Sequence, residues 1–246
     1  MNVKWGGLGP VRIATLIFAA AMLVGLYFLL KNKSRKTQTW VLGCLSFLGI
    51  AAIIYNLSDG YILQNLPLQL CSYNALILPV VVFSRNKTMG NLLLVWSLGA
   101  LAAIALPFEL VETELLSWTF FFYFFPHVME FGIPILLFKL GHIKKDPKCI
   151  FSTVTISMAA YTVSHLANKL INSLELLDRD GDLIHVNYMF SIEPTNPLVE
   201  MFYKVIPYEY WHMYMVIPIL VVYLLVVYAP QLLAAAKAKK AAAQAE

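Results

Sequence analysis

Residues 11–30 read VRIATLIFAAAMLVGLYFLL, and residues 31–36, which follow directly, read KNKSRK. A helix needs about 20 mostly apolar residues to cross a bilayer, so the first stretch has the length and composition of a spanning helix. It is too long for the apolar part of a signal peptide, and no small-residue cleavage site follows it. We therefore expect a retained membrane helix whose end is marked by a basic loop.

Six further apolar runs follow, and the seven together use up most of the chain. Backbone groups in lipid must be paired within their own segment, so each run predicts a helix. The expected helices span residues 11–30, 38–57, 67–84, 90–108, 118–140, 150–173 and 210–231. The prediction is an all-α bundle of seven transmembrane helices that forms a single transmembrane domain over residues 1–246.

Composition supports a lipid environment. Of the 246 residues, 60% are hydrophobic and 13% are charged, whereas a soluble domain has roughly 45–50% apolar and about 25% charged residues. The net charge of +4 comes from loop lysines and arginines rather than from a basic face interleaved with aromatics, so we expect membrane lipids as partners and neither nucleic acid nor a soluble partner. Three cysteines without a CxxC pair predict neither a disulfide framework nor a metal site.

The loops sort by charge. Thirteen of the 18 basic residues fall in alternate loops or in the tail: Lys31, Lys33, Arg35, Lys36, Arg85, Lys87, Lys139, Lys144, Lys145, Lys148, Lys237, Lys239 and Lys240. The other loops are mainly acidic. Basic loops face the cytoplasm, so we expect an N-terminus outside, a cytoplasmic tail at 233–246 and an extracytoplasmic loop at 174–209. The expected location is the bacterial cytoplasmic membrane.

The long loop contains a turn, Asp178–Asp182, that superficially resembles a calcium loop. An EF-hand that begins at Asp178 needs glycine where Leu183 stands and glutamate where Met189 stands, so we interpret the segment as a solvated acidic turn. The less polar stretch that includes Asn187 and Tyr188 is expected to fold back over the helices.

Polar residues within the expected spans are the informative ones, since ionisable groups in lipid usually face a bundle interior or a watery cavity. His127 and Glu130 lie three residues apart on one helix face, as do Cys71 and Asn74. Each pair also has a structural interpretation: a satisfied His–Glu pair in the first case, and a small buried hydrophobe for the cysteine in the second.

A third polar stripe consists of His165, Asn168 and Asn172. Interhelical hydrogen bonding explains Asn172 best, whereas His165 and Asn168 are expected to line a cavity. Cys71, His127, His165 and Asn168 all map to the outer half of the membrane, with Glu130 near its middle. This agreement in depth predicts a polar site that faces the extracytoplasmic side.

Three motifs resemble those of one family. The stretch Leu66-Pro67-Leu68-Gln69-Leu70-Cys71, the Pro126-His127 pair and the stretch Asn187-Tyr188-Met189-Phe190 resemble the YwaF family of bacterial integral membrane proteins, to which the eukaryotic transmembrane protein 164 is similar. The resemblance implies an acyltransferase that uses a cysteine nucleophile and a histidine base, and these roles fall on Cys71 and His127. The chain departs from the family at Gln69, where the family commonly has histidine.

Two functions remain open from the sequence. The first is a membrane acyltransferase, or an acyl hydrolase, that acts on lipid acyl chains without a cofactor, with Asn74 or Asn168 as oxyanion donor. The alternative is a small-molecule transporter or binding protein in which His127, Glu130 and His165 form a polar cavity open to the outer side. A scaffold without chemistry is also possible, but a retinal photoreceptor is excluded because the last expected helix contains no lysine.

Overall fold

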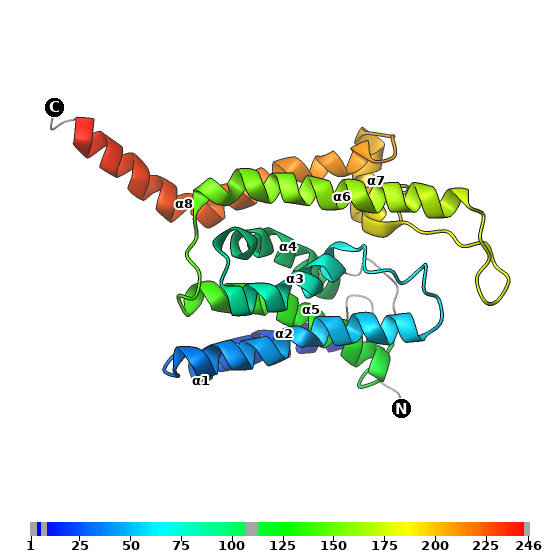
Figure 1. Cartoon of the computed structure of the whole chain (residues 1–246), viewed down its shortest axis with the longest axis horizontal. Helices are drawn as coiled ribbons and strands as arrows, with labels where there is room; N and C mark the ends of the chain where they lie inside the picture. The colour runs from blue at the N-terminus through cyan, green and yellow to red at the C-terminus, as the bar shows by residue number, and fades with distance from the viewer. Residues whose placement is uncertain (1–3, 6–8, 107–112, 244–246) are drawn as a thin grey trace.

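The computed structural model describes residues 4–5, 9–106 and 113–243, and these residues are predominantly helical. The α-helices are α1 (Pro10–Leu30), α2 (Arg35–Ser58), α3 (Leu70–Ser84), α4 (Lys87–Ala105), α5 (Trp118–Lys139), α6 (Ile150–Ser173), α7 (Pro197–Val205) and α8 (Val216–Ala243). Short 3₁₀ turns cover Pro147–Cys149, Tyr188–Phe190 and Trp211–Met215, and the short strands β1 (Lys4–Trp5) and β2 (Thr113–Glu114) pair antiparallel. In Figure 1 the long helices run side by side, with α3, α4 and α5 between α1 and α2 on one side and α6 and α8 on the other.

The expectation of an all-α membrane protein is confirmed. Within the described residues, six helical segments are long and apolar enough to cross a membrane: Pro10–Leu30, Arg35–Ser58, Lys87–Ala105, Trp118–Lys139, Pro147–Ser173 and Trp211–Ala238. The seventh expected span corresponds to α3, which is also apolar but has only 15 residues. At 1.5 Å per residue it is about 22 Å long, shorter than the hydrocarbon core of a typical bilayer.

Helix boundaries differ from the expectations at two places. Pro67 was expected in the first turn of a helix, which is wrong, because α3 begins at Leu70 with Gln69 as its N-cap, and residues 66–69 form an irregular lead-in. The last helix was expected over 210–231, with the alanine-rich tail from Ala234 as a helix end. It begins later, because a 3₁₀ turn covers Trp211–Met215, and α8 continues through the tail to Ala243. Its alanine-rich composition explains the continuation, since alanine has the highest helix propensity.

The long loop, 174–209, has structure of its own. Leu177 and Leu183 form an isolated bridge around the acidic turn, and Asp178 Oδ1 accepts hydrogen bonds from the backbone N–H groups of Asp180 and Asp182. Helix α7 follows, with Asn196 as its N-cap and Pro197 in its first turn. This pair is a recognised start signal for a helix, so the sequence contained the evidence for α7.

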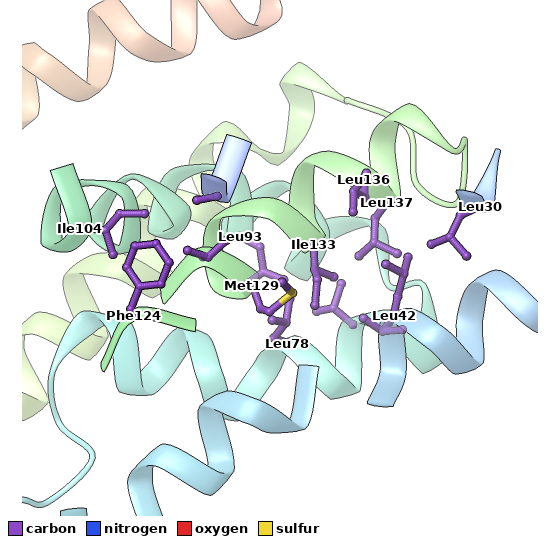
Figure 2. Packing of buried hydrophobic residues seen from close by; sticks show 14 of the residues in the cluster. Leu30, Leu42, Leu78, Leu93, Ile104, Phe124, Met129, Ile133, Leu136 and Leu137 are labelled. Carbon is purple, nitrogen blue, oxygen red and sulfur yellow. The ribbon is translucent and has the colours of Figure 1, made fainter. Parts of the chain in front are cut away.

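Helix α5 is the centre of the bundle. Its buried side chains pack against α1, α2, α3 and α4 in one continuous core. Figure 2 shows Leu78 of α3 beside Met129 of α5, with Leu93 of α4 and Leu42 of α2 in the same cluster. Helices α1 and α8, by contrast, expose most of their apolar residues, which suits contact with lipid tails.

Contacts bring the ends of α3 and α5 to the start of α2. Arg85, directly after α3, donates to Thr39 Oγ1 (3.0 Å), and His142, just past α5, donates from Nε2 to Gln38 Oε1 (2.8 Å). Burial, followed by the nearby Arg35 and Arg85 charges, lowers the pKa of His142 to about 4. The His142 ring is therefore neutral at physiological pH. Because the ends of α3 and α5 both lie beside the start of α2, these two helices run in the same direction.

The same end of the bundle receives the start of α4 and the segment before α6. Lys87 pairs with Asp146 at 2.6 Å, and Asn91 Oδ1 accepts a hydrogen bond from Tyr228 of α8 at 2.7 Å. Residues 31–36, 85–87 and 139–148 thus lie together, and we call this the basic end. The charge sorting seen in the sequence is therefore a spatial separation in the fold.

The opposite end, which we call the acidic end, holds residues 59–69 and the loop 174–209. Tyr61 donates to Asp180, Arg179 donates to the backbone oxygen of Asp59 (2.5 Å), and Lys169 pairs with Glu209 at 3.0 Å. These contacts hold the long loop over the ends of α2, α3 and α6.

Arg12 is a basic residue at the acidic end, and sequence reasoning missed it. Its side chain is 3% exposed and donates to the backbone oxygens of Ile104 (2.9 Å) and Leu106 (2.8 Å). Carbonyl groups in the last turn of a helix lack intrahelical partners. Arg12 therefore supplies hydrogen bonds to the carbonyl groups at the end of α4 and fixes α1 against that helix.

Candidate functional site

Cys71 is the second residue of α3 and is half-buried. The first intrahelical bond of α3 runs from the Tyr73 N–H to the Gln69 oxygen (3.0 Å). Cys71 therefore lies in the first turn of the helix, before that bond. A helix N-terminus favours negative charge, so the Cys71 thiol lies where a thiolate and a developing oxyanion are both stabilised.

One turn further into α3, Asn74 contacts α5. Its Nδ2 donates to the Glu130 backbone oxygen at 3.3 Å, and the two residues are 0% and 3% exposed. Gly49 of α2 packs against the same point, because a Cβ built there would lie 3.1 Å from Glu130 Oε1. Helices α2, α3 and α5 therefore meet at Glu130.

This contact sets the relative depth of Cys71 and His127. Cys71 precedes Asn74 by three residues and His127 precedes Glu130 by three residues, so each lies about one turn closer to the acidic end. Since α3 and α5 run in the same direction, the two residues lie at a similar depth.

The His127 ring is half-buried and oriented by its own helix. Its Nδ1 is hydrogen-bonded to the Tyr123 backbone oxygen, and its ring lies 4.7 Å from that of Tyr123. A carbonyl oxygen can only accept, so Nδ1 carries the proton in the neutral ring. The other nitrogen, Nε2, then holds the lone pair that can take a proton from a substrate or from a thiol.

Gln69 holds the loop against the start of α3. Its Oε1 accepts a hydrogen bond from the Met189 N–H at 2.8 Å, and Tyr188 donates from its hydroxyl to the Leu63 oxygen. Asn187 closes its own turn by accepting from the Ile192 N–H (3.0 Å) and donating to the Glu193 oxygen (2.8 Å). The segment with Asn187 and Tyr188 folds back over the helices, and a side chain next to Cys71 holds it there.

The polar stripe of α6 binds the same segment. Asn168 is fully buried and pairs with Tyr188, accepting from its N–H (2.8 Å) and donating to its oxygen (2.9 Å). Asn172 makes the equivalent pair of bonds to Val186, and His165 Nδ1 lies 3.1 Å from Ser191 Oγ. Both amides therefore bind the loop rather than another helix as was expected for Asn172, and Asn168 is too buried to line an open cavity.

Two serines of this network were not singled out from the sequence. Ser191 is fully buried and accepts a hydrogen bond from Asn168 Nδ2 (2.9 Å), and Ser164 donates to the Leu68 oxygen (2.8 Å) beside the start of α3. Ser164 precedes Asn168 by one helical turn, so the spacing of the stripe could have revealed it. Ser191 has no periodic signal because it lies in a loop.

No metal site is visible in the described part of the chain, where no three His, Cys, Asp or Glu side chains gather closely enough to hold an ion. The Asp178 carboxylate instead accepts from backbone N–H groups of its own turn.

Comparison with known proteins gives one match. A model of the TMEM164 family matches residues 7–228, a range that runs from just before α1 well into α8. No curated protein and no solved structure matches the chain.

Proposed function

The chain belongs to the TMEM164 family, and we propose that it is a membrane-embedded acyltransferase that moves acyl chains between lipids, with Cys71 as nucleophile and His127 as base. One observation carries the proposal. The cysteine stands at a helix N-terminus, and the contact between Asn74 and Glu130 puts it at a depth similar to that of a histidine whose Nε2 holds a lone pair. This arrangement matches that of an activated cysteine nucleophile.

The reaction proceeds in two steps, acylation of Cys71 and transfer of the acyl chain to an acceptor. His127 Nε2 takes the proton of the Cys71 thiol, and the thiolate attacks the ester carbonyl carbon of a phospholipid. The ester C–O bond breaks, the lysolipid leaves with the proton from His127, and the acyl chain remains on Cys71 as a thioester. A lysolipid hydroxyl, deprotonated by His127, then attacks the thioester and regenerates the thiol. With water as acceptor, the same steps release a fatty acid.

The backbone of α3 is the best source of oxyanion donors. Asn168 donates through its amide to the Tyr188 oxygen and to Ser191 Oγ, and Asn74 donates to the Glu130 oxygen. Backbone N–H groups in the first turn of α3 lie beside Cys71. Donors of this kind stabilise the negative oxygen of a tetrahedral intermediate.

At position 69 the family commonly has histidine, and this chain has glutamine. The side chain can still position the loop but cannot take part in proton transfer. A glutamine side chain cannot act as a base, and its oxygen is engaged by the Met189 N–H. In this chain the proton transfer therefore falls to His127 alone, while Gln69 positions the loop above the nucleophile.

We further propose seven spans, of which α3 with its lead-in is the short one. The N-terminus and the acidic end lie outside, and the C-terminus lies in the cytoplasm. The positive-inside rule supports this orientation. In a chain whose three native cysteines are replaced by alanine, Asp180→Cys is expected to react with an impermeant maleimide in intact cells. Lys33→Cys is expected to react only after permeabilisation. The reverse pattern would overturn the orientation.

The acyl-enzyme is the direct test of the mechanism. Purified protein in phospholipid nanodiscs is expected to gain the mass of an acyl chain, and hydroxylamine should remove it because it cleaves thioesters. Cys71→Ala should show no adduct. Cys44→Ala, which removes an exposed cysteine of α2, should behave as wild type.

The adduct experiment also separates the alternatives. An adduct on Cys71→Ala would mean that another residue is acylated. No adduct on any variant, together with unchanged lipid turnover in Cys71→Ala, would remove Cys71 as nucleophile. A transport or binding role that depends on His127 and Glu130 would then be the better explanation.

A further inference from the structure

A groove opens at the basic end, away from the candidate active site. It has a volume of about 560 Å³ and lies between α4, α5 and α8, with the segment after α5 along one side. Lys139 borders it and follows His127 by twelve residues on α5, roughly 18 Å along the helix axis. The groove is therefore separate from the Cys71 region.

Three lysines face this groove: Lys139, Lys144 and Lys145. The first two are exposed, and Lys145 is half-buried with its Nζ 3.4 Å from the Val227 oxygen. No carboxylate lines the groove, and the neighbouring Asp146 is paired with Lys87. The groove thus has an uncompensated positive charge along one edge.

The remaining wall of the groove is mainly apolar and aromatic, and the polar Gln231 also lines it. Leu94, Phe138, Tyr223 and Val227 form the apolar part, and Tyr223 donates to the Leu94 oxygen at 2.8 Å. A free inorganic anion gains nothing from such a wall, whereas an acyl chain buries its methylene groups there at about 0.8 kcal/mol each.

A second groove adjoins the first. It has about 390 Å³, runs between α1 and α5, and is lined almost entirely by apolar side chains such as Leu23 and Leu136. Ile135 and Lys139 border both grooves. Two apolar grooves that meet at one lysine match the shape of a lipid with two chains and one charged headgroup.

We propose that these grooves bind one anionic diacyl phospholipid from the leaflet at the basic end. Its phosphate lies among Lys139, Lys144 and Lys145, and its two chains run along the two sides of Ile135. Lysine side chains place their ammonium groups at headgroup level while their stems stay in the apolar region. Clusters of basic residues between spanning helices at this side of a membrane suit such headgroups.

Native mass spectrometry of the detergent-purified chain tests the proposal. Titration with phosphatidylglycerol is expected to give a one-to-one complex several-fold tighter than that with phosphatidylcholine. The triple variant Lys139→Gln, Lys144→Gln, Lys145→Gln should weaken phosphatidylglycerol binding by about tenfold or more. The matched control Lys33→Gln, Lys36→Gln, Lys148→Gln removes three lysines of the same end that do not line the groove, and it should bind as wild type.

A second variant tests the apolar wall without changing charge. Val227→Phe fills the first groove and is expected to weaken phosphatidylglycerol binding several-fold while the melting temperature without added lipid stays near the wild-type value. Inorganic phosphate is expected to compete poorly. Competition by phosphate at the same concentration as the lipid would show an anion site rather than a lipid site. If both lysine triple variants lost phosphatidylglycerol binding equally, overall charge rather than this groove would explain the binding.

Discussion

His127→Gln is expected to lower acyl turnover by about a hundredfold to ten-thousandfold, the usual contribution of a positioned general base. Glutamine is similar in size and can still donate to the Tyr123 oxygen, as the His127 ring does, so the helix should stay intact. It has no group that takes a proton near neutral pH. Turnover is measured as transfer of a labelled acyl chain from a phospholipid to a lysolipid in nanodiscs.

The pH profile distinguishes a base from a structural role. Without His127 the thiolate must form by simple ionisation, so its population grows as pH rises. The rate of His127→Gln should therefore rise with pH, and its deficit relative to wild type should narrow towards alkaline pH. A deficit that is constant across pH would indicate misfolding or lost packing instead. His185→Gln, a change in an exposed loop histidine paired with Glu193, is the matched control and should keep wild-type turnover.

The membrane fold was predictable because lipid imposes a simple rule on sequence. Every long span must be apolar and internally hydrogen-bonded, and the helices α1, α2, α5 and α6 begin and end within a few residues of the expected positions. Elements outside that rule were missed. Helix α7 is short, and the irregular residues before Leu70 contact the loop through Gln69, a contact that no local pattern encodes.

The candidate site was predictable in depth but not in contacts. Counting residues from the helix ends placed Cys71 and His127 at one level, since rise per residue is fixed. The partners of Asn168 could not be foreseen, because its amide bonds the backbone of Tyr188, twenty residues further along in an irregular loop. A polar residue in a span thus indicates that a partner exists without saying whether it is a ligand, another helix or a loop.

The same reasoning explains why Arg12 escaped notice. A lone arginine at the start of an apolar run looks like an interfacial anchor, and its true partners are backbone oxygens more than ninety residues away. Long-range contacts to main-chain atoms leave no trace in periodicity or charge.

The packing of the site depends on the close approach of α2 to α3 at Gly49. A Cβ at this position would lie 2.6 Å from the Ala75 Cβ and 3.1 Å from Glu130 Oε1. Gly49→Leu must therefore push α3 away from α2, and we expect a loss of about 1–3 kcal/mol in the free energy of unfolding, or more, as overpacked cores show. The shift also separates Asn74 from Glu130, so turnover should fall even in the fraction that folds.

Gly25→Leu is the matched control, because a Cβ at Gly25 meets nothing within 4 Å, and this variant should unfold at or slightly above the wild-type temperature. Exchanging the glycine and the alanine between positions 49 and 75 tests the contact between α2 and α3 directly. Gly49→Ala alone should destabilise, and Ala75→Gly added to it removes the clashing methyl group and should recover much of the stability, although a glycine inside a helix costs about 1 kcal/mol. If Gly49→Ala and Gly25→Ala prove equally stable in detergent melting experiments, then α2 and α3 do not pack this closely, and the proposed register of Cys71 against His127 loses its support.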